Sequence, residues 1–206
     1  FSKKAIVSAG IFIRAVADRP CGEEFALNHS VRLAFCSIVT AAGTAVMLLT
    51  GLIPAGTYAL PAMAGTLLIP VVAEAGTGWA FRVYLAEAVL TVLLAADKEA
   101  ALFFLLFFGY YPALKAVLEK RIRFRWICRA AKLAVFNAAA VLEFWAAFRF
   151  LGVPVESYVL FWRAVPLLFL LFGNIVFLVY DYALSLLVLA YYGRLHALFR
   201  KWFHGK

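Results

Sequence analysis

Long apolar segments, separated by short polar ones, constrain this chain more than any other feature of its sequence. About 20 helical residues cross the roughly 30 Å of hydrocarbon in a bilayer, and six apolar segments reach or approach that length. They cover residues 31–53, 59–75, 79–96, 99–119, 128–151 and 160–193. Hydrophobic residues make up 66% of the chain and charged residues only 15%, too little polar surface to cover a water-soluble globule. The sequence therefore predicts an all-α integral membrane protein, a six-span helical bundle.

Two domains follow from the same division of the chain. Residues 1–29 combine a short apolar stretch with the polar sequence ADRPCGEEFALNHS, which cannot lie in hydrocarbon, so we expect an N-terminal interfacial or surface arm. A cleaved signal peptide is the less favoured alternative, because charged residues continue beyond the small residues SAG. Residues 30–206 are expected to form the membrane domain with a short basic tail. The segment 59–75 is the weakest predicted span, because it is short and contains Pro61 and Pro70.

The distribution of basic residues predicts the orientation in the membrane. The net charge of +9 is concentrated between apolar segments, as topology signals are, and does not indicate binding to nucleic acid. Basic loops stay in the cytoplasm. The most basic ones are the connection after residue 119 and the C-terminal tail, with Lys120, Arg121, Arg123, Arg125, Arg129, Arg194, Arg200, Lys201 and Lys206. Six spans then place both termini in the cytoplasm. The expected location is the plasma membrane or the bacterial inner membrane.

Motifs of catalysis and metal binding are missing from the sequence. The three cysteines, Cys21, Cys36 and Cys128, have neither metal-binding spacing nor the even number of a disulfide framework. There is no Gly-x-Ser-x-Gly elbow, phosphate-binding glycine loop or pair of histidines at ligand spacing. We therefore expect no enzyme activity, no metal and no cofactor.

Ionisable residues inside the apolar segments are the strongest indication of a functional site. Glu87, Glu143 and Asp181 lie well inside predicted spans, where a charge costs about 2.5–3.5 kcal/mol even on the lenient insertion scale. Such residues normally face the interior of a bundle or a wet cavity, and Arg82 is the nearest cation in depth to Glu87 and Asp181. They indicate either interhelical ion pairs that fix the packing or a site for a substrate or proton.

Helical spacing places several polar residues on common faces. Asn174, Asp181, Ser185 and Tyr192 are separated by seven, four and seven residues, which forms one narrow stripe. Tyr84, Glu87 and Thr91 share a face of the third predicted span, and Met63, Thr66, Pro70 and Glu74 roughly share one of the second. These stripes predict one internal polar cavity. Its ligand-binding candidates are Glu87, Asp181, Asn174, Ser185, Arg82 and Tyr84.

The segment LFFLLFFGYYPALKAVLEKRIRFR, residues 102–125, passes from aromatic to basic with Gly109 and Pro112 near the junction. A proline inside a helix frees a carbonyl one turn earlier, here near Phe108, and a glycine allows close approach, so we predict a kink. Phe104, Phe108, Tyr111 and Lys115 are spaced to share one face. The simpler interpretation is an interfacial aromatic belt with a snorkelling lysine; the alternative is an aromatic wall of a ligand pocket.

Three segments carry a resemblance to known proteins: AAGTAVM, ALPAMAGTLLIPVVAEAG and ALFFLLFFGYYPALK. They resemble the substrate-binding S components of energy-coupling factor transporters, or a poorly described group of bacterial membrane proteins related to that fold. Ala41 and Ala45 in AAGTAVM resemble the small-residue patch by which S components dock on their coupling subunit. ALPAMAGTLLIPVVAEAG resembles the Pro- and Gly-rich second span of that fold, and ALFFLLFFGYYPALK a signature of the related group. No riboflavin-, thiamine- or biotin-type signature is found.

The resemblance implies a small-molecule binding subunit that captures a water-soluble ligand from the outer side. Its implied partners are a coupling transmembrane subunit and ATPases, which supply the energy. The alternative is a non-transporting scaffold that recruits proteins or anionic lipids through the basic segment 120–132, with Arg121, Arg123 and Arg125 in contact. A third candidate is a proton-coupled carrier that uses Glu87 and Asp181.

Overall fold

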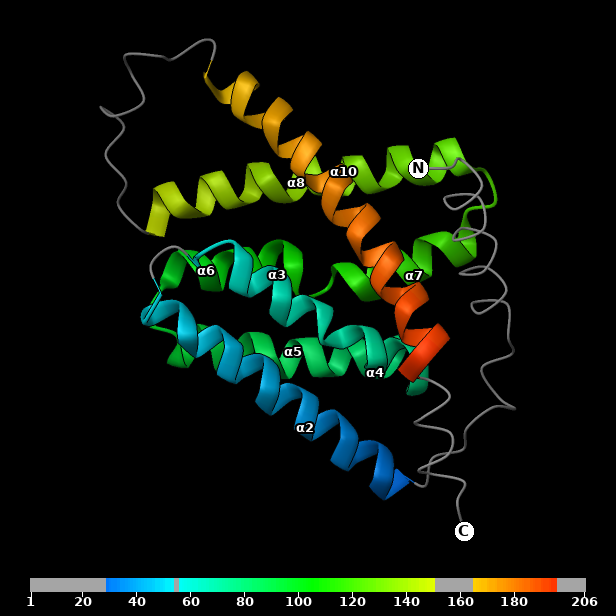
Figure 1. The fold of residues 1–206 in the computed structure, drawn as a ribbon. Helices are drawn as coiled ribbons and strands as arrows, with labels where there is room; N and C mark the ends of the chain where they lie inside the picture. Colours follow the sequence, from blue (N-terminus) through cyan, green and yellow to red (C-terminus); the bar gives the residue numbers. More distant parts are fainter. Residues whose placement is uncertain (1–28, 54–55, 151–164, 196–206) are drawn as a thin grey trace.

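The computed structural model describes residues 29–53, 56–150 and 165–195, and every regular element in these ranges is a helix (Figure 1). This confirms the all-α prediction, whereas the arm predicted over 1–29 lies outside the described residues except for His29. The elements are α2 (His29–Leu48), η1 (Leu49–Gly51), α3 (Ala59–Thr66), α4 (Leu68–Glu74), α5 (Thr77–Leu94), α6 (Lys98–Phe103), η3 (Phe104–Phe108), α7 (Tyr111–Arg121), α8 (Arg125–Phe150), α10 (Val165–Ala190) and η4 (Tyr191–Leu195). Of these, η1 is a 3-10 turn, and η3 and η4 are π-helical.

Four helical stretches are long and apolar enough to cross a membrane, which supports the prediction of an integral membrane protein. They are His29–Gly51, Thr77–Leu94, Lys98–Arg121 and Leu170–Gly193. Large apolar side chains point outward from them, as expected where the surroundings are lipid rather than water. Examples are Ile38, Leu85, Leu93, Leu171, Phe172 and Val179, all more than half exposed. Among the described residues, Glu87, Lys115 and Lys132 are buried instead.

The other two predicted spans differ from these four stretches. The segment 59–75 forms two short helices, α3 and α4, which are interrupted at Leu67, three residues before Pro70. Pro70 has no N–H to bond to the carbonyl one turn earlier, which explains why a continuous helix is not maintained there. The fifth predicted span corresponds to α8, a long helix that also carries charged side chains. The count of six spans remains a prediction.

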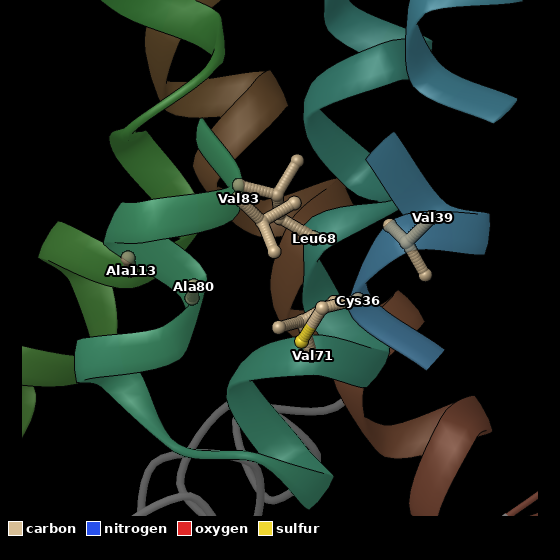
Figure 2. Packing of buried hydrophobic residues seen from close by; sticks show 7 residues of the cluster. All are labelled: Cys36, Val39, Leu68, Val71, Ala80, Val83 and Ala113. Carbon is tan, nitrogen blue, oxygen red and sulfur yellow. The ribbon is translucent and has the colours of Figure 1, made fainter. Parts of the chain in front are cut away.

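The helices pack into three apolar clusters. One lies where α2, α4, α5 and α7 meet and is shown in Figure 2; it consists of Cys36, Val39, Leu68, Val71, Ala80, Val83 and Ala113. A second cluster, with Met47, Ala64, Ala88, Ala100 and Phe104, joins α2, α3, α5, α6 and η3. The third joins η3, α4 and α7 to α8, α10 and η4 through Ile69, Phe107, Tyr111, Ala139, Phe177, Leu184 and Tyr191. Small residues in all three clusters allow the helices to approach closely.

The helix is interrupted at the place where a kink is predicted, around Gly109 and Pro112. The Gly109 N–H donates to the Phe104 carbonyl at 2.8 Å, one residue further back than in an α-helix, and α7 begins anew at Tyr111 with Pro112 in its first turn. A methyl group added at Gly109 would lie 2.6 Å from the Tyr84 ring, and one added at Gly65 would overlap the carbonyl oxygen of Phe108. Glycine is therefore required at both positions by close packing.

Gly65→Ala should destabilise the protein by about 1–3 kcal/mol, because the added methyl meets backbone that cannot rotate away. Gly78→Ala is the matched control: nothing lies within 4 Å of a methyl group at this helical glycine. The control should be neutral or slightly stabilising, by at most about 1 kcal/mol. The free energy of unfolding in detergent micelles measures both, and equal effects of the two substitutions would contradict the contact between Gly65 and Phe108.

Candidate functional site

Asp181, near the middle of α10, accepts hydrogen bonds from two other helices. Its Oδ1 atom lies 2.6 Å from Lys115 Nζ and 2.7 Å from the Tyr111 hydroxyl, both on α7. Lys115 also donates to the Asp181 carbonyl at 2.6 Å and to Ser185 Oγ at 2.7 Å. The Lys115 ammonium thus finds three oxygens on two successive turns of α10.

A second lysine, on α8, closes this group of side chains. Lys132 Nζ lies 2.5 Å from Glu119 Oε1 and 3.2 Å from Asp181 Oδ1. Glu119 Oε1 in turn lies 3.9 Å from Lys115 Nζ. We name this group the Asp181 cluster; its members are Tyr111, Lys115, Glu119, Lys132, Asp181 and Ser185. Two ammonium groups face two carboxylates, so the charges of the cluster balance.

Because the two lysines are buried, their contacts have a large effect on the stability of the fold. Lys115 is 3% exposed and Lys132 is 5% exposed, so both ammonium groups have lost nearly all contact with their surroundings outside the protein. Taking a charge into a low-dielectric interior costs several kcal/mol, and the attraction of a partner offsets this only when geometry and hydrogen bonding are good. The snorkelling interpretation of Lys115 is therefore wrong: its side chain points inward and the paired carboxylate compensates its charge.

Helical spacing explains how the sequence builds the cluster. Tyr111, Lys115 and Glu119 succeed one another every four residues on α7, and Asp181 and Ser185 are also one turn apart. The sequence analysis found Asp181 and Ser185 but did not assign Glu119 and Lys132 to the site. The four-residue spacing from Tyr111 was a usable signal for Glu119. Lys132 was counted with the basic topology signal, and nothing local distinguishes it from the exposed Arg129.

The phase of the aromatic segment also differs from the prediction. Phe104 packs with Met47 and Ala88 in one cluster, whereas Tyr111 packs with Phe177 in another. The π-helical segment η3 inserts an extra residue into the turn, which rotates everything after it by about 100° relative to a regular helix. One continuous aromatic face from Phe104 to Lys115 is therefore not formed.

Asn174 lies on the same stripe of α10 as Asp181 and makes a reciprocal amide pair with Asn137 on α8. The Asn137 amide donates to Asn174 Oδ1 at 3.1 Å, and the Asn174 amide donates to Asn137 Oδ1 at 3.0 Å. Each side-chain nitrogen also donates to the carbonyl four residues earlier in its own helix. These contacts join α8 to α10 and use both donor hydrogens of each side-chain amide.

The polar residues of α5 lie in other surroundings than the Asp181 cluster. The Tyr84 hydroxyl donates to the Leu105 carbonyl at 2.7 Å. Glu87 is fully buried, and a methyl group placed on Gly43 of α2 would overlap its carboxyl group. Arg82 is exposed and its guanidinium lies 4.7 Å from the centre of the Trp79 ring. The ion pairs of Asp181 are with Lys115 and Lys132, rather than with the Arg82 partner that the sequence suggested.

The residues predicted to contact partners or lipids are exposed in the structure. Ala41 and Ala45 are exposed on α2. Arg121, Arg123 and Arg125 are exposed around the connection from α7 to α8, where Phe124 and Trp126 are 71% and 81% exposed. Cys36 and Cys128 are buried free thiols. Within the described ranges, no three His, Cys, Asp or Glu side chains gather as a metal site would require.

Comparisons with family models, curated proteins and solved structures found no match to this chain. The resemblance to S components therefore remains a prediction that depends on the residues quoted for it. The geometry of the Asp181 cluster stands independently of that resemblance. It is a charge-balanced polar group, formed by three helices, inside an apolar protein.

Removing Lys115 or Asp181 should destabilise the fold in a coupled manner. Lys115→Met and Asp181→Asn should each cost several kcal/mol, up to the 3–5 kcal/mol of a broken buried pair. The double variant should cost less than the sum, because neither substitution then leaves the other charge without this partner. Denaturation in mixed micelles measures the coupling, with Lys98→Met, at an exposed lysine on α6, as the control. Strictly additive costs would show that the two side chains do not interact.

Proposed function

We propose that the chain is the small-molecule binding subunit of a membrane transporter, with the Asp181 cluster as its binding site. The observation that carries this proposal is the concentration of hydrogen-bonding groups in the cluster: two ammonium groups, two carboxylates, a phenol and a hydroxyl between apolar helices. Ionisable residues inside membrane segments are expensive and usually mark substrate or ion pathways. Replacing a buried ion pair by apolar residues is often neutral or stabilising, so stability alone does not account for the cluster.

The chemistry of the cluster suits a small, water-soluble, polar ligand. Lys115 and Lys132 can donate hydrogen bonds to an anionic group of a ligand, and Asp181 and Glu119 can accept them from a cationic group. The hydroxyls of Tyr111 and Ser185 can donate or accept. Apart from Glu119 Oε2, which has no hydrogen-bond partner among the described residues, these groups bond to one another, so a ligand would have to exchange contacts with them. Because they come from α7, α8 and α10, a small shift of one helix would expose several of them together.

The remaining parts of the proposal concern topology and partners. Six spans with both termini in the cytoplasm would make the chain a multi-pass protein of the plasma or bacterial inner membrane. Energy would come from a coupling transmembrane subunit and ATPases, in line with the resemblance to S components. The exposed face with Ala41 and Ala45 supports a close helix contact with such a partner, because small residues let two backbones approach.

A scaffold function is the second candidate, and one observation favours it. Around the connection from α7 to α8, Arg123 and Arg125 alternate with Phe124 and Trp126, and all four side chains are exposed. Basic residues attract anionic lipid heads and exposed aromatic rings insert at the interface, so this segment suits lipid contact. Such contact is compatible with either function, which is why the ligand experiment decides between them.

Cysteine accessibility tests the orientation. In a background without native cysteines, Lys98→Cys should react with an impermeant thiol reagent added outside intact cells, whereas Arg123→Cys should react only after permeabilisation. Both positions are exposed on the protein, so any difference in labelling reflects the membrane rather than burial. Labelling of Arg123→Cys from outside would reverse the topology.

Ligand retention tests the binding site. Native mass spectrometry of the gently solubilised wild type should reveal a bound small molecule and, at low detergent, coupling subunits. Ser185→Ala, which removes one hydroxyl contact of Lys115, should lower ligand occupancy several-fold while the melting temperature changes little, and Asp181→Asn should abolish retention. Ser37→Ala is the matched control, because Ser37 is an exposed serine that donates only within α2. A wild type that carries lipid alone, or full retention by both site variants, would contradict the proposal.

A further inference from the structure

Glu87 is the most completely buried acid in the described part of the chain, and it lies apart from the Asp181 cluster. It occupies the middle of α5, with 0% of its surface exposed. Its carboxyl group is pressed against α2 at Gly43, where even a methyl group would overlap it. One turn further along α5, Thr91 is 1% exposed.

The surroundings of Glu87 contain no compensating charge. Within the described residues, neither Glu87 oxygen has a hydrogen-bond partner, and the Thr91 hydroxyl has none either. Inward-facing titratable or charged residues on the neighbouring helices α2, α4 and α7 are Arg32, Cys36, Glu74, Tyr111, Lys115 and Glu119. The charged residues of α6, Lys98 and Glu99, are exposed.

Those neighbours have contacts of their own. Lys115 and Tyr111 contact Asp181, and Glu119 contacts Lys132. Glu74 accepts from Tyr191, and Arg32 lies over the Trp79 ring. An ionised carboxylate at Glu87 would therefore be buried without a counter-charge or donor, a state that costs so much that buried acids take up a proton instead.

We propose that Glu87 is a proton-binding site of the membrane domain. Its carboxyl group carries the proton, and is therefore neutral, while α2 and α5 are packed together. The contact with Gly43 favours a proton over a metal ion, because hard cations such as Ca²⁺ take about six to eight oxygen ligands. Here Thr91 is the neighbouring side-chain oxygen at helical spacing.

Loss of this proton has a structural consequence. A charged Glu87 needs water or a cation, and the close contact of its carboxyl group with Gly43 leaves room for neither at this point without separation of α2 from α5. Protonation therefore stabilises the packed arrangement of these two helices, and deprotonation favours an opened one. This role does not depend on the ligand-binding proposal, which concerns α7, α8 and α10.

A hydrophobic carbodiimide tests the protonation state directly in the wild-type chain. Dicyclohexylcarbodiimide enters apolar regions and reacts with protonated carboxyl groups. The acid O–H adds across one C=N bond to give an O-acylisourea, and transfer of the acyl group to nitrogen yields a stable N-acylurea without a leaving group. Peptide mapping by mass spectrometry then assigns the adduct to its carboxyl group. We expect an adduct at Glu87 that decreases as the pH is raised.

Two controls separate this result from general reactivity. A water-soluble carbodiimide should modify exposed Glu99 and spare Glu87, and Glu87→Gln should lose the adduct at this position. Because glutamine imitates a neutral acid, Glu87→Gln should keep the wild-type melting temperature, whereas Asp181→Asn should lower it. Absence of an adduct at Glu87 in folded protein would overturn the proposal. An equal loss of melting temperature in Glu87→Gln and Asp181→Asn would also overturn it.

Discussion

The contact of Asp181 with two buried lysines determines how α7, α8 and α10 can meet. Lipid tails are as apolar as leucine, so apolar helices in a bilayer gain little from hydrophobic association with one another. Polar contacts that cannot be satisfied in hydrocarbon discriminate between alternative packings much more strongly. Lys115 and Lys132 both reach the Asp181 carboxylate only when α7, α8 and α10 adopt the observed register. The amide pair of Asn137 and Asn174 adds a second fixed point between α8 and α10.

The placement of Lys115 depends in turn on the irregular segment before it. In a regular helix, Lys115 would share a face with Phe104, which packs in the cluster between α2, α3, α5 and α6. The π-helical segment and the new start at Tyr111 turn the later residues toward α10 instead. Gly65 and Gly109 let neighbouring elements approach this irregular stretch, so two glycines, one proline and the π-helical turn together direct the lysine to its partner.

Sequence reasoning located most helices and the interruption near Pro112, because apolar length, proline and glycine act locally, but it did not predict the interruption at Leu67. The predicted segment 79–96 and the observed Thr77–Leu94 differ by two residues at each end. The partners within the site required tertiary information. The sequence predicted one cavity shared by Glu87 and Asp181, whereas their contacts in the structure lie on different helices. Depth in the membrane suggested Arg82 as the counter-charge, but depth says nothing of direction around a helix, and Arg82 lies over Trp79.

The two buried acids show why burial alone does not define a function. Asp181 accepts hydrogen bonds from Tyr111, Lys115 and Lys132, so its charge is compensated inside the protein. Glu87 is fully buried against Gly43 and has no hydrogen-bond partner among the described residues, so only its neutral form fits the packed state. An acid with compensated charge suits recognition of polar molecules, whereas an uncompensated acid suits coupling of protonation to helix packing. The difference arises from the helix opposite each acid: α7 presents lysine and tyrosine to Asp181, and α2 presents glycine to Glu87.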